Sequence, residues 1–209
     1  MTILIISIII SALAYIIAEY NNASVIKYIF KPITTLLVII IACMQMSNLQ
    51  DIYADLIIVG LLFSLAGDIF LMHPRDRFVF GLGSFLIAHI LFIIAISDGL
   101  NSVYDFLILL PAALYTLIFL KLILPKTGEM KLPVIVYALV LMIFLWQASV
   151  EYYYSAEVSA FYAFLGAVLF VISDSFLAHA RFIGKKFYSI AVIHITYWMA
   201  LVYLALSIK

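Results

Sequence analysis

The chain has 209 residues, of which 68% are hydrophobic and 11% are charged, and its formal net charge is zero. A mean hydropathy of +1.27 leaves too little polar surface for a water-soluble domain and predicts an integral membrane protein. The single cysteine, Cys43, excludes an internal disulfide. We therefore expect the lipid bilayer as the surroundings of the chain and no nucleic-acid partner.

Apolar stretches of about 20 residues, the helix length that spans about 30 Å of hydrocarbon, occur eight times. In chain order we place them at 2–18, 33–50, 55–73, 78–97, 103–124, 131–150, 158–179 and 187–207. The connections between them are too short for a soluble domain. We therefore predict an all-α, polytopic membrane helix bundle that forms one domain over 1–209.

The basic residues predict the orientation, because lysine and arginine near span ends stay on the cytoplasmic side. Ten of the eleven lie at alternate connections: Lys27, Lys31, Arg75, Arg77, Lys121, Lys126, Lys131, Arg181, Lys185 and Lys186. On the other side, Lys209 is joined by acidic residues: Asp51, Asp55, Asp98, Asp105, Glu151 and Glu157. We expect both termini outside, the basic loops in the cytoplasm, and a location in the inner membrane of a bacterium.

One motif occurs twice, about a hundred residues apart. The copies centre on Asp68 and Asp174, and after each aspartate a Phe follows at position +2, a Leu at +3, a His at +5 and an Arg at +7. The second copy begins four spans after the first, so both halves run in the same direction through the membrane. We predict two parallel four-helix repeats, roughly 1–100 and 101–209, related by a pseudo-twofold axis along the membrane normal.

The two aspartates are the main candidates for function. An ionisable residue at the centre of a membrane costs about 2.5–3.5 kcal/mol and usually faces the bundle interior or a wet cavity. Asp68 shares its helix face with Gly60 and Ser64, small residues that let a neighbouring backbone approach. We expect both carboxyls to point inward and to lie within roughly 10 Å of each other, the upper range for pairs that act on one substrate. The alternative is that they only hydrogen-bond one helix to another.

Each half also carries a histidine inside an apolar stretch, His89 in the first and His194 in the second. We expect a functional role for His89, whereas core packing and ligand contact both remain open for His194. The chain has no His-x3-His, Glu-x-x-His or Cys-x-x-Cys spacing. We therefore expect no metal centre.

The residues at 61–71, which include Gly67-Asp68, and at 80–89, which end in His89, resemble the central signature of the YhhN family, the bacterial and animal lysoplasmalogenases. Further similarities cover nearly the whole chain: Lys31-Pro32 with Thr34, Gly166-Ala167, Ser173-Asp174 and Thr196-Tyr197. One position departs from the family pattern, where Leu201 stands in place of a glutamine.

The resemblance implies hydrolysis of the vinyl ether bond of lysoplasmalogens, a class of lysophospholipids, to a fatty aldehyde and a glycerophospho-ethanolamine or -choline. A vinyl ether is cleaved by protonation at carbon, and water then captures the oxocarbenium ion. One carboxylic acid and one carboxylate can divide this chemistry, as in glycosidases, with no cofactor.

These roles lead to a set of expected site residues. Asp68 and Asp174 are the expected catalytic pair, and we favour Asp174 as the carboxylate because Ser173 and Ser175 flank it. His89 is expected to orient water or the ether oxygen. The remaining residues are expected to bind substrate: Lys31, Ser64, Arg75, Arg181, His194 and Tyr197.

Two other classes of protein fit part of the pattern. A proton-coupled transporter would also have duplicated halves and membrane-embedded acids, but it needs a polar path, and the outer parts at 56–62 and 161–165 hold no charge. A lipid-binding or scaffolding protein without catalysis would keep its function with Asn at both acidic positions.

Overall fold

The computed structural model describes residues 1–46, 51–97 and 105–208, and this part of the chain is all α-helical. The α-helices in chain order are α1 (Thr2–Tyr20), α2 (Ser24–Gln45), α3 (Ile52–Met72), α4 (Phe78–Ile96), α5 (Asp105–Ile123), α6 (Lys131–Ser155), α7 (Val158–Phe182) and α8 (Ser189–Leu206). Short 3-10 segments, η1 (Leu124–Lys126) and η2 (Gly128–Met130), join α5 to α6. Eight helical segments are long and apolar enough to cross a membrane, which confirms the prediction of a polytopic helix bundle.

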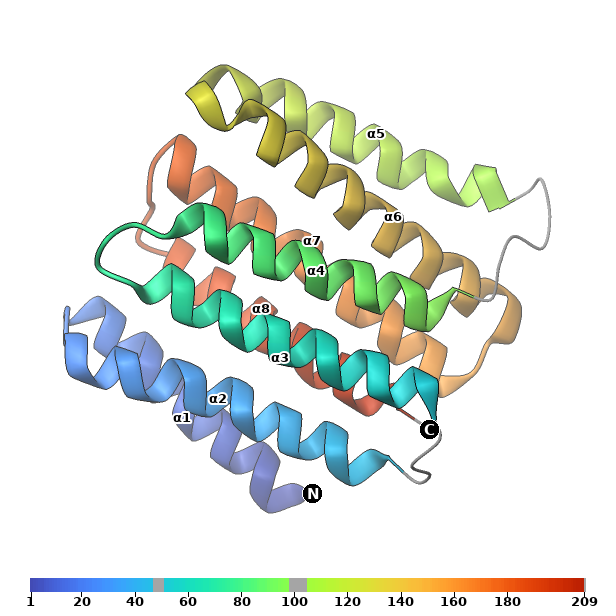
Figure 1. The fold of residues 1–209 in the computed structure, drawn as a ribbon, viewed down its shortest axis with the longest axis horizontal. Helices are drawn as coiled ribbons and strands as arrows, with labels where there is room; N and C mark the ends of the chain where they lie inside the picture. Colours follow the sequence, from blue (N-terminus) through green and yellow to red (C-terminus); the bar gives the residue numbers. More distant parts are fainter. Residues whose placement is uncertain (47–50, 98–104, 209) are drawn as a thin grey trace.

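The helices lie side by side along a common direction (Figure 1). The pair α1 and α2 forms one flank, the pair α5 and α6 forms the other, and the remaining four helices lie between them. The connections at 21–23, 73–77, 124–130 and 183–188 all lie at one end, which we call the basic end because it carries the lysines and arginines. Both termini lie toward the opposite end.

The two halves of the chain contact each other through α2 and α6. Helix α2 packs on α3 of its own half and on α8, whereas α6 packs on α7 of its own half and on α4. The tightest pairs are α3 with α4 and α7 with α8. These neighbours recur four helices apart, as a parallel repeat requires, although the predicted pseudo-twofold axis itself stays a prediction.

The bundle centre is apolar and closely packed. Its largest side chains include Phe92 and Phe170, each less than 2% exposed. Glycines on α3 permit the close approach of α4, because a Cβ atom at Gly67 would lie 2.6 Å from the ring of Phe85. Outside, large apolar side chains such as Leu117 remain exposed, as expected for helices that face lipid.

The predicted start of the second span was wrong. Helix α2 begins at Ser24, well before residue 33, and continues through Pro32. Membrane helices tolerate an internal proline because neighbouring groups satisfy the freed backbone carbonyl. As a consequence Lys31 belongs to the helix, not to a connection, and its side chain is buried. The predicted end of this span, residues 47–50, lies outside the described residues.

Candidate active site

Asp68 lies at the centre of a buried polar cluster formed by α2, α3 and α8. Its Oδ1 atom is 3.1 Å from the Lys31 ammonium. Its Oδ2 atom accepts hydrogen bonds from the Thr35 hydroxyl at 2.7 Å and from the Tyr197 hydroxyl at 2.8 Å. Asp68 is 1% exposed. Every oxygen of this carboxyl therefore has a donor, and a cation balances its charge.

The helix geometry of α2 explains how the sequence builds this cluster. Lys31 and Thr35 are four residues apart, so both side chains project from the same face of the helix. The indole of Trp198 donates a further, longer hydrogen bond of 3.4 Å to the Thr35 hydroxyl. The cluster thus holds α2 to α3 and to α8 at once.

Asp174 lies in a different environment on α7. The hydroxyl of Tyr137, on α6, donates a hydrogen bond of 2.5 Å to its Oδ2 atom. Within 1–46, 51–97 and 105–208, no basic side chain forms an ion pair with Asp174. The two aspartates, at equivalent positions of the repeated motif, therefore have unlike partners.

A charged cavity opens at the basic end of the bundle. We call it the vestibule, and its lining includes four basic side chains, two acidic ones and a histidine: Lys27, Lys31, Arg181, Lys185, Glu19, Asp76 and His194. Glu19 bridges Lys27 at 3.1 Å and Lys185 at 3.0 Å. Lys31 is shared between the vestibule and the Asp68 cluster, so the cluster borders this cavity.

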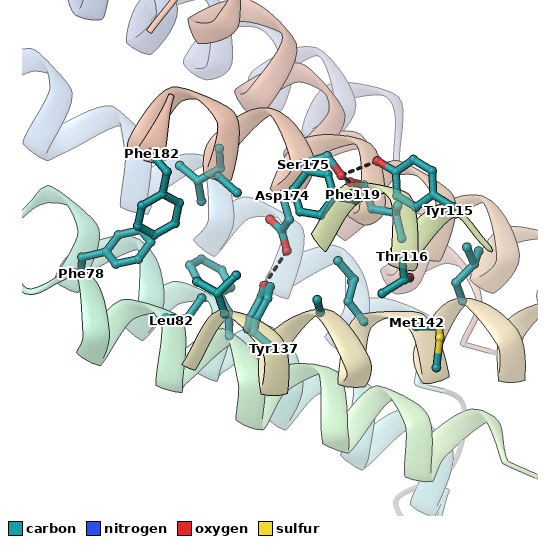
Figure 2. Close-up of a pocket in the computed structure, with 18 of the residues that line it drawn as sticks. Phe78, Leu82, Tyr115, Thr116, Phe119, Tyr137, Met142, Asp174, Ser175 and Phe182 are labelled. Atoms are coloured by element: carbon teal, nitrogen blue, oxygen red, sulfur yellow. Dashed lines mark hydrogen bonds between the residues drawn. The ribbon is translucent and has the colours of Figure 1, made fainter. Parts of the chain in front are cut away.

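A second cavity, which we call the apolar cavity, lies between α4, α5, α6 and α7 and has a volume of about 60 Å³. Its lining is almost entirely apolar, with side chains such as Leu82, Phe119 and Met142. Figure 2 shows Asp174 and Tyr137 pointing toward each other within this lining. Asp174 is thus a carboxyl group in a cavity whose other polar groups are hydroxyls, without a basic side chain in the lining.

The vestibule and the apolar cavity share a wall. Leu71, Phe78 and Leu177 line both cavities. The Phe78 ring is held by the Arg181 guanidinium, whose carbon lies 4.7 Å from the ring centre. Arg181 in turn forms an ion pair of 2.6 Å with Asp76. A polar compartment and an apolar one therefore meet at one aromatic side chain.

A series of aromatic rings connects the two aspartates. The ring centres are 5.8 Å apart for Tyr197 and Phe170, 4.7 Å for Phe170 and His89, and 5.5 Å for His89 and Tyr137. His89 is 1% exposed, and among the described residues neither of its ring nitrogens has a hydrogen-bond partner. The distance between the two carboxyls stays a prediction, as does the role of His89.

The other residues expected from the sequence fall into three places. His194 lines the vestibule, with its ring 4.6 Å from that of Tyr15. Ser64 is fully buried and donates to the Gly60 carbonyl at 3.0 Å, so it packs α3 and does not face a cavity lining. Arg75 is exposed in the 73–77 connection and lines neither the vestibule nor the apolar cavity.

Three residues of the site were not expected from the sequence: Thr35, Tyr137 and Phe78. A tyrosine in an apolar helix resembles the many other aromatic residues of this chain, so its residue type alone carries no signal. A spacing signal did exist for Tyr137, because it precedes Asp174 by 37 residues, as Lys31 precedes Asp68.

Fold and site define the class of this protein: a multi-pass α-helical membrane protein with a buried aspartate, Asp68, and a second aspartate, Asp174, in the lining of an apolar cavity. The family model of the YhhN family matches residues 26–208, so the chain belongs to that family. It is 28% identical over 159 residues to proteins named uncharacterized membrane protein YhhN from Escherichia coli O157:H7 and Shigella flexneri, which covers 75% of this chain and 74% of each relative. No solved structure matches the chain.

Proposed function

We propose that this membrane protein hydrolyses the vinyl ether bond of lysoplasmalogens, releasing a fatty aldehyde and a glycerophospho-headgroup. The observation that carries the proposal is the unlike pairing of the two aspartates: Asp68 with the Lys31 cation, and Asp174 with the neutral Tyr137 hydroxyl. Vinyl ether hydrolysis needs a proton donor at carbon, and a carboxylic acid in an apolar cavity suits that task.

Asp174 takes the role of the acid in this mechanism. A carboxylate in apolar surroundings without a cation is strongly disfavoured, so the group is held neutral. The serines that flank Asp174 in the sequence had favoured the opposite assignment, with Asp174 as the carboxylate. The contacts favour this one, because Ser173 donates to the Ile193 carbonyl at 3.0 Å and Ser175 to the Val171 carbonyl at 2.6 Å. Each of these serine hydroxyls donates to a backbone carbonyl and not to the Asp174 carboxyl.

Asp68 acts through Lys31. The ion pair fixes the Lys31 ammonium at the border of the vestibule, where it can bind the phosphate or the glycerol oxygens of the substrate. A lysine without this partner would be a costly buried cation. Asp68 is therefore a positioning residue in this scheme, and Asp174 is the catalytic one.

The two cavities fit the two parts of such a lipid. The vestibule has charged side chains of both signs for a polar headgroup, and the apolar cavity has an apolar lining for the first part of a hydrocarbon chain. The wall that they share at Phe78 corresponds to the junction of the headgroup and the chain. In such a lipid the vinyl ether bond lies at the same junction, and Asp174 lines the cavity on the side of the chain.

The chemical steps balance with water as the only co-reactant. Asp174 transfers its proton to the outer carbon of the double bond, which leaves an oxocarbenium ion at the carbon bearing the ether oxygen. Water adds to that carbon and gives a proton back to the Asp174 carboxylate. The hemiacetal then releases the glycerol oxygen as an alcohol and becomes the aldehyde.

An assay of the purified protein tests the proposal. The wild type should release aldehyde from a lysoplasmalogen but not from the alkyl-ether or acyl analogues, which lack the double bond. Asp174→Asn should lower the rate by at least about 10²-fold, the low end for general acid catalysis. Asp55→Asn is the matched control, because Asp55 is exposed at the far end of α3, and this variant should keep the wild-type rate.

A transporter remains the second candidate class, but the core argues against it. Between the ends of the bundle, the described interior is filled by apolar side chains such as Ile57, Leu61 and Phe144, each less than 2% exposed. If the wild type releases no aldehyde from any vinyl-ether lysolipid, while Asp174→Asn abolishes proton-driven uptake into vesicles, the hydrolase proposal is wrong and the transporter takes its place.

A further inference from the structure

Tyr137 occupies in the second half of the chain the place that Lys31 occupies in the first. Each residue precedes its aspartate by 37 positions. Lys31 lies on α2, which packs on the Asp68 helix α3, and Tyr137 lies on α6, which packs on the Asp174 helix α7. Both side chains end at a carboxyl oxygen of that aspartate. The same geometric position thus carries a cation in one half and a neutral hydroxyl in the other.

This single difference changes the charge that each aspartate can carry. A lysine at this position supplies the positive charge that a buried carboxylate needs. A tyrosine supplies one hydrogen bond and no charge. Its O–H donates to Oδ2 of Asp174, which leaves Oδ1 to hold the acidic proton.

The surroundings hold the Tyr137 ring in this direction. Its edge lies against His89, with the ring centres 5.5 Å apart and the planes at 86°. Its hydroxyl points to Asp174 inside the apolar cavity (Figure 2). A second tyrosine of the same cavity, Tyr115, instead contacts the Ser175 hydroxyl at 2.6 Å. The two tyrosines therefore share a cavity but differ in whether they contact the acid.

We propose that Tyr137 is the positioning residue that occupies Oδ2 of Asp174 and so leaves the acidic proton on Oδ1, whereas the apolar surroundings, without a cation, keep the carboxyl neutral. The catalytic part of this inference rests on the proposed hydrolase function. The protonation part does not, because it concerns only the carboxyl group and its partner.

Infrared spectroscopy of the purified protein at neutral pH tests the protonation part. The wild type should show the C=O stretching band of a neutral carboxylic acid, and Asp174→Asn should lack it. Tyr137→Phe should keep this band but shift it, because the hydrogen bond to the carbonyl oxygen is lost. Tyr137→Lys should remove the band, because it gives Asp174 the cation that Asp68 already has.

Controls make the result specific. Tyr115→Phe and Asp68→Asn should leave the band unchanged, since neither residue is a partner of Asp174. A band that stays at the wild-type position in Tyr137→Phe, or the absence of any Asp174-dependent band in the wild type, would overturn the inference. Tyr137→Phe is nearly isosteric, so the test does not depend on whether the lysine variant folds.

Kinetics test the catalytic part. Tyr137→Phe should lower kcat by about tenfold, the value of one hydrogen bond, with KM unchanged, whereas Asp55→Asn, at the far end of α3, should leave kcat as in the wild type. An unchanged kcat in Tyr137→Phe would overturn the positioning role. If the infrared pattern holds but the wild type releases no aldehyde, the hydrolase proposal fails and the assignment of Tyr137 as the hydrogen-bond partner of a neutral Asp174 stands.

Discussion

Arg181 and Asp76 form an ion pair of 2.6 Å that joins the end of α7 to the 73–77 connection. The Arg181 guanidinium also covers the Phe78 ring, which separates the vestibule from the apolar cavity. The ion pair is exposed, so it adds little stability. Together with the Phe182 ring, whose centre is 6.0 Å from that of Phe78, the Arg181 guanidinium packs on Phe78 in the shared wall.

Breaking this ion pair should open the wall. In a Cys43→Ser background, a cysteine placed at Leu82 would report on the apolar cavity through its reaction with a water-soluble thiol reagent. Asp76→Asn should speed this reaction several-fold, because the released Arg181 no longer holds Phe78. Asn also tolerates the left-handed backbone of this position, where φ is 45°. Arg75→Gln is the matched control and should have no effect.

The same ion pair should resist mild acid. Its hydrogen bond from Arg181 holds the pKa of Asp76 below the usual range. A depressed folded-state pKa means that the contribution of the pair is complete above the unfolded value of about 3.9 and is lost only as pH falls through the folded value. Lowering the pH from about 7 to about 5 should therefore leave the labelling rate unchanged, once corrected for a free thiol standard. A rise in this range would contradict the assigned pairing.

The Lys31 and Asp68 ion pair should behave as a unit in stability. Lys31→Met leaves an uncompensated buried carboxylate and should destabilise the protein by about 3–5 kcal/mol. Adding Asp68→Asn removes that charge and should recover much of the loss. Thermal unfolding of the detergent-solubilised protein measures both effects. A double variant less stable than Lys31→Met alone would show that the two residues do not compensate each other.

The apolar cavity should set the length of chain that the protein accepts. Ala138 lines this cavity, so Ala138→Phe should fill part of it and exclude the end of a long chain. Each methylene removed from contact is worth about 0.8 kcal/mol, so the preference between long and short lysoplasmalogens should shift roughly fourfold per methylene excluded. Relative kcat/KM across a chain-length series measures the shift. An unchanged preference would place the chain elsewhere.

The orientation of the bundle is open to a direct test. Reporter fusions in the 73–77, 124–130 and 183–188 connections should report the cytoplasm, because the basic residues gather at this end. A fusion between Ser155 and Val158 should report the outside. One fusion on the wrong side would break the predicted topology and, with it, the parallel relation of the two halves.

Sequence reasoning predicted the helices well because the membrane imposes one dominant rule, a long apolar stretch for each crossing. It failed at α2, where Lys27, Lys31 and Pro32 lie inside the helix. A hydropathy pattern treats charge and proline as the edge of a span. It does not include the ion pair that Lys31 forms with Asp68, 37 residues further along the chain.

The site was predictable in part for a related reason. Asp68 and Asp174 stand out because an acid in a membrane helix is rare and costly. Their partners do not stand out, since Thr35 and Tyr137 are ordinary residues of apolar helices. Their importance lies in packing between helices, which one sequence does not specify. The division of the interior into two cavities also depends on side-chain packing, at Phe78 and its neighbours.

The position of Phe78 between the vestibule and the apolar cavity has a consequence for the two products of the proposed hydrolysis. One fragment would be left among charged groups at the mouth of the bundle, and the other among hydrocarbon side chains between α4, α5, α6 and α7. Water would take up the first fragment and the bilayer the second. Because each fragment is poorly soluble in the phase that takes up the other, the two would not meet again, and partition into separate phases would draw the reaction forward.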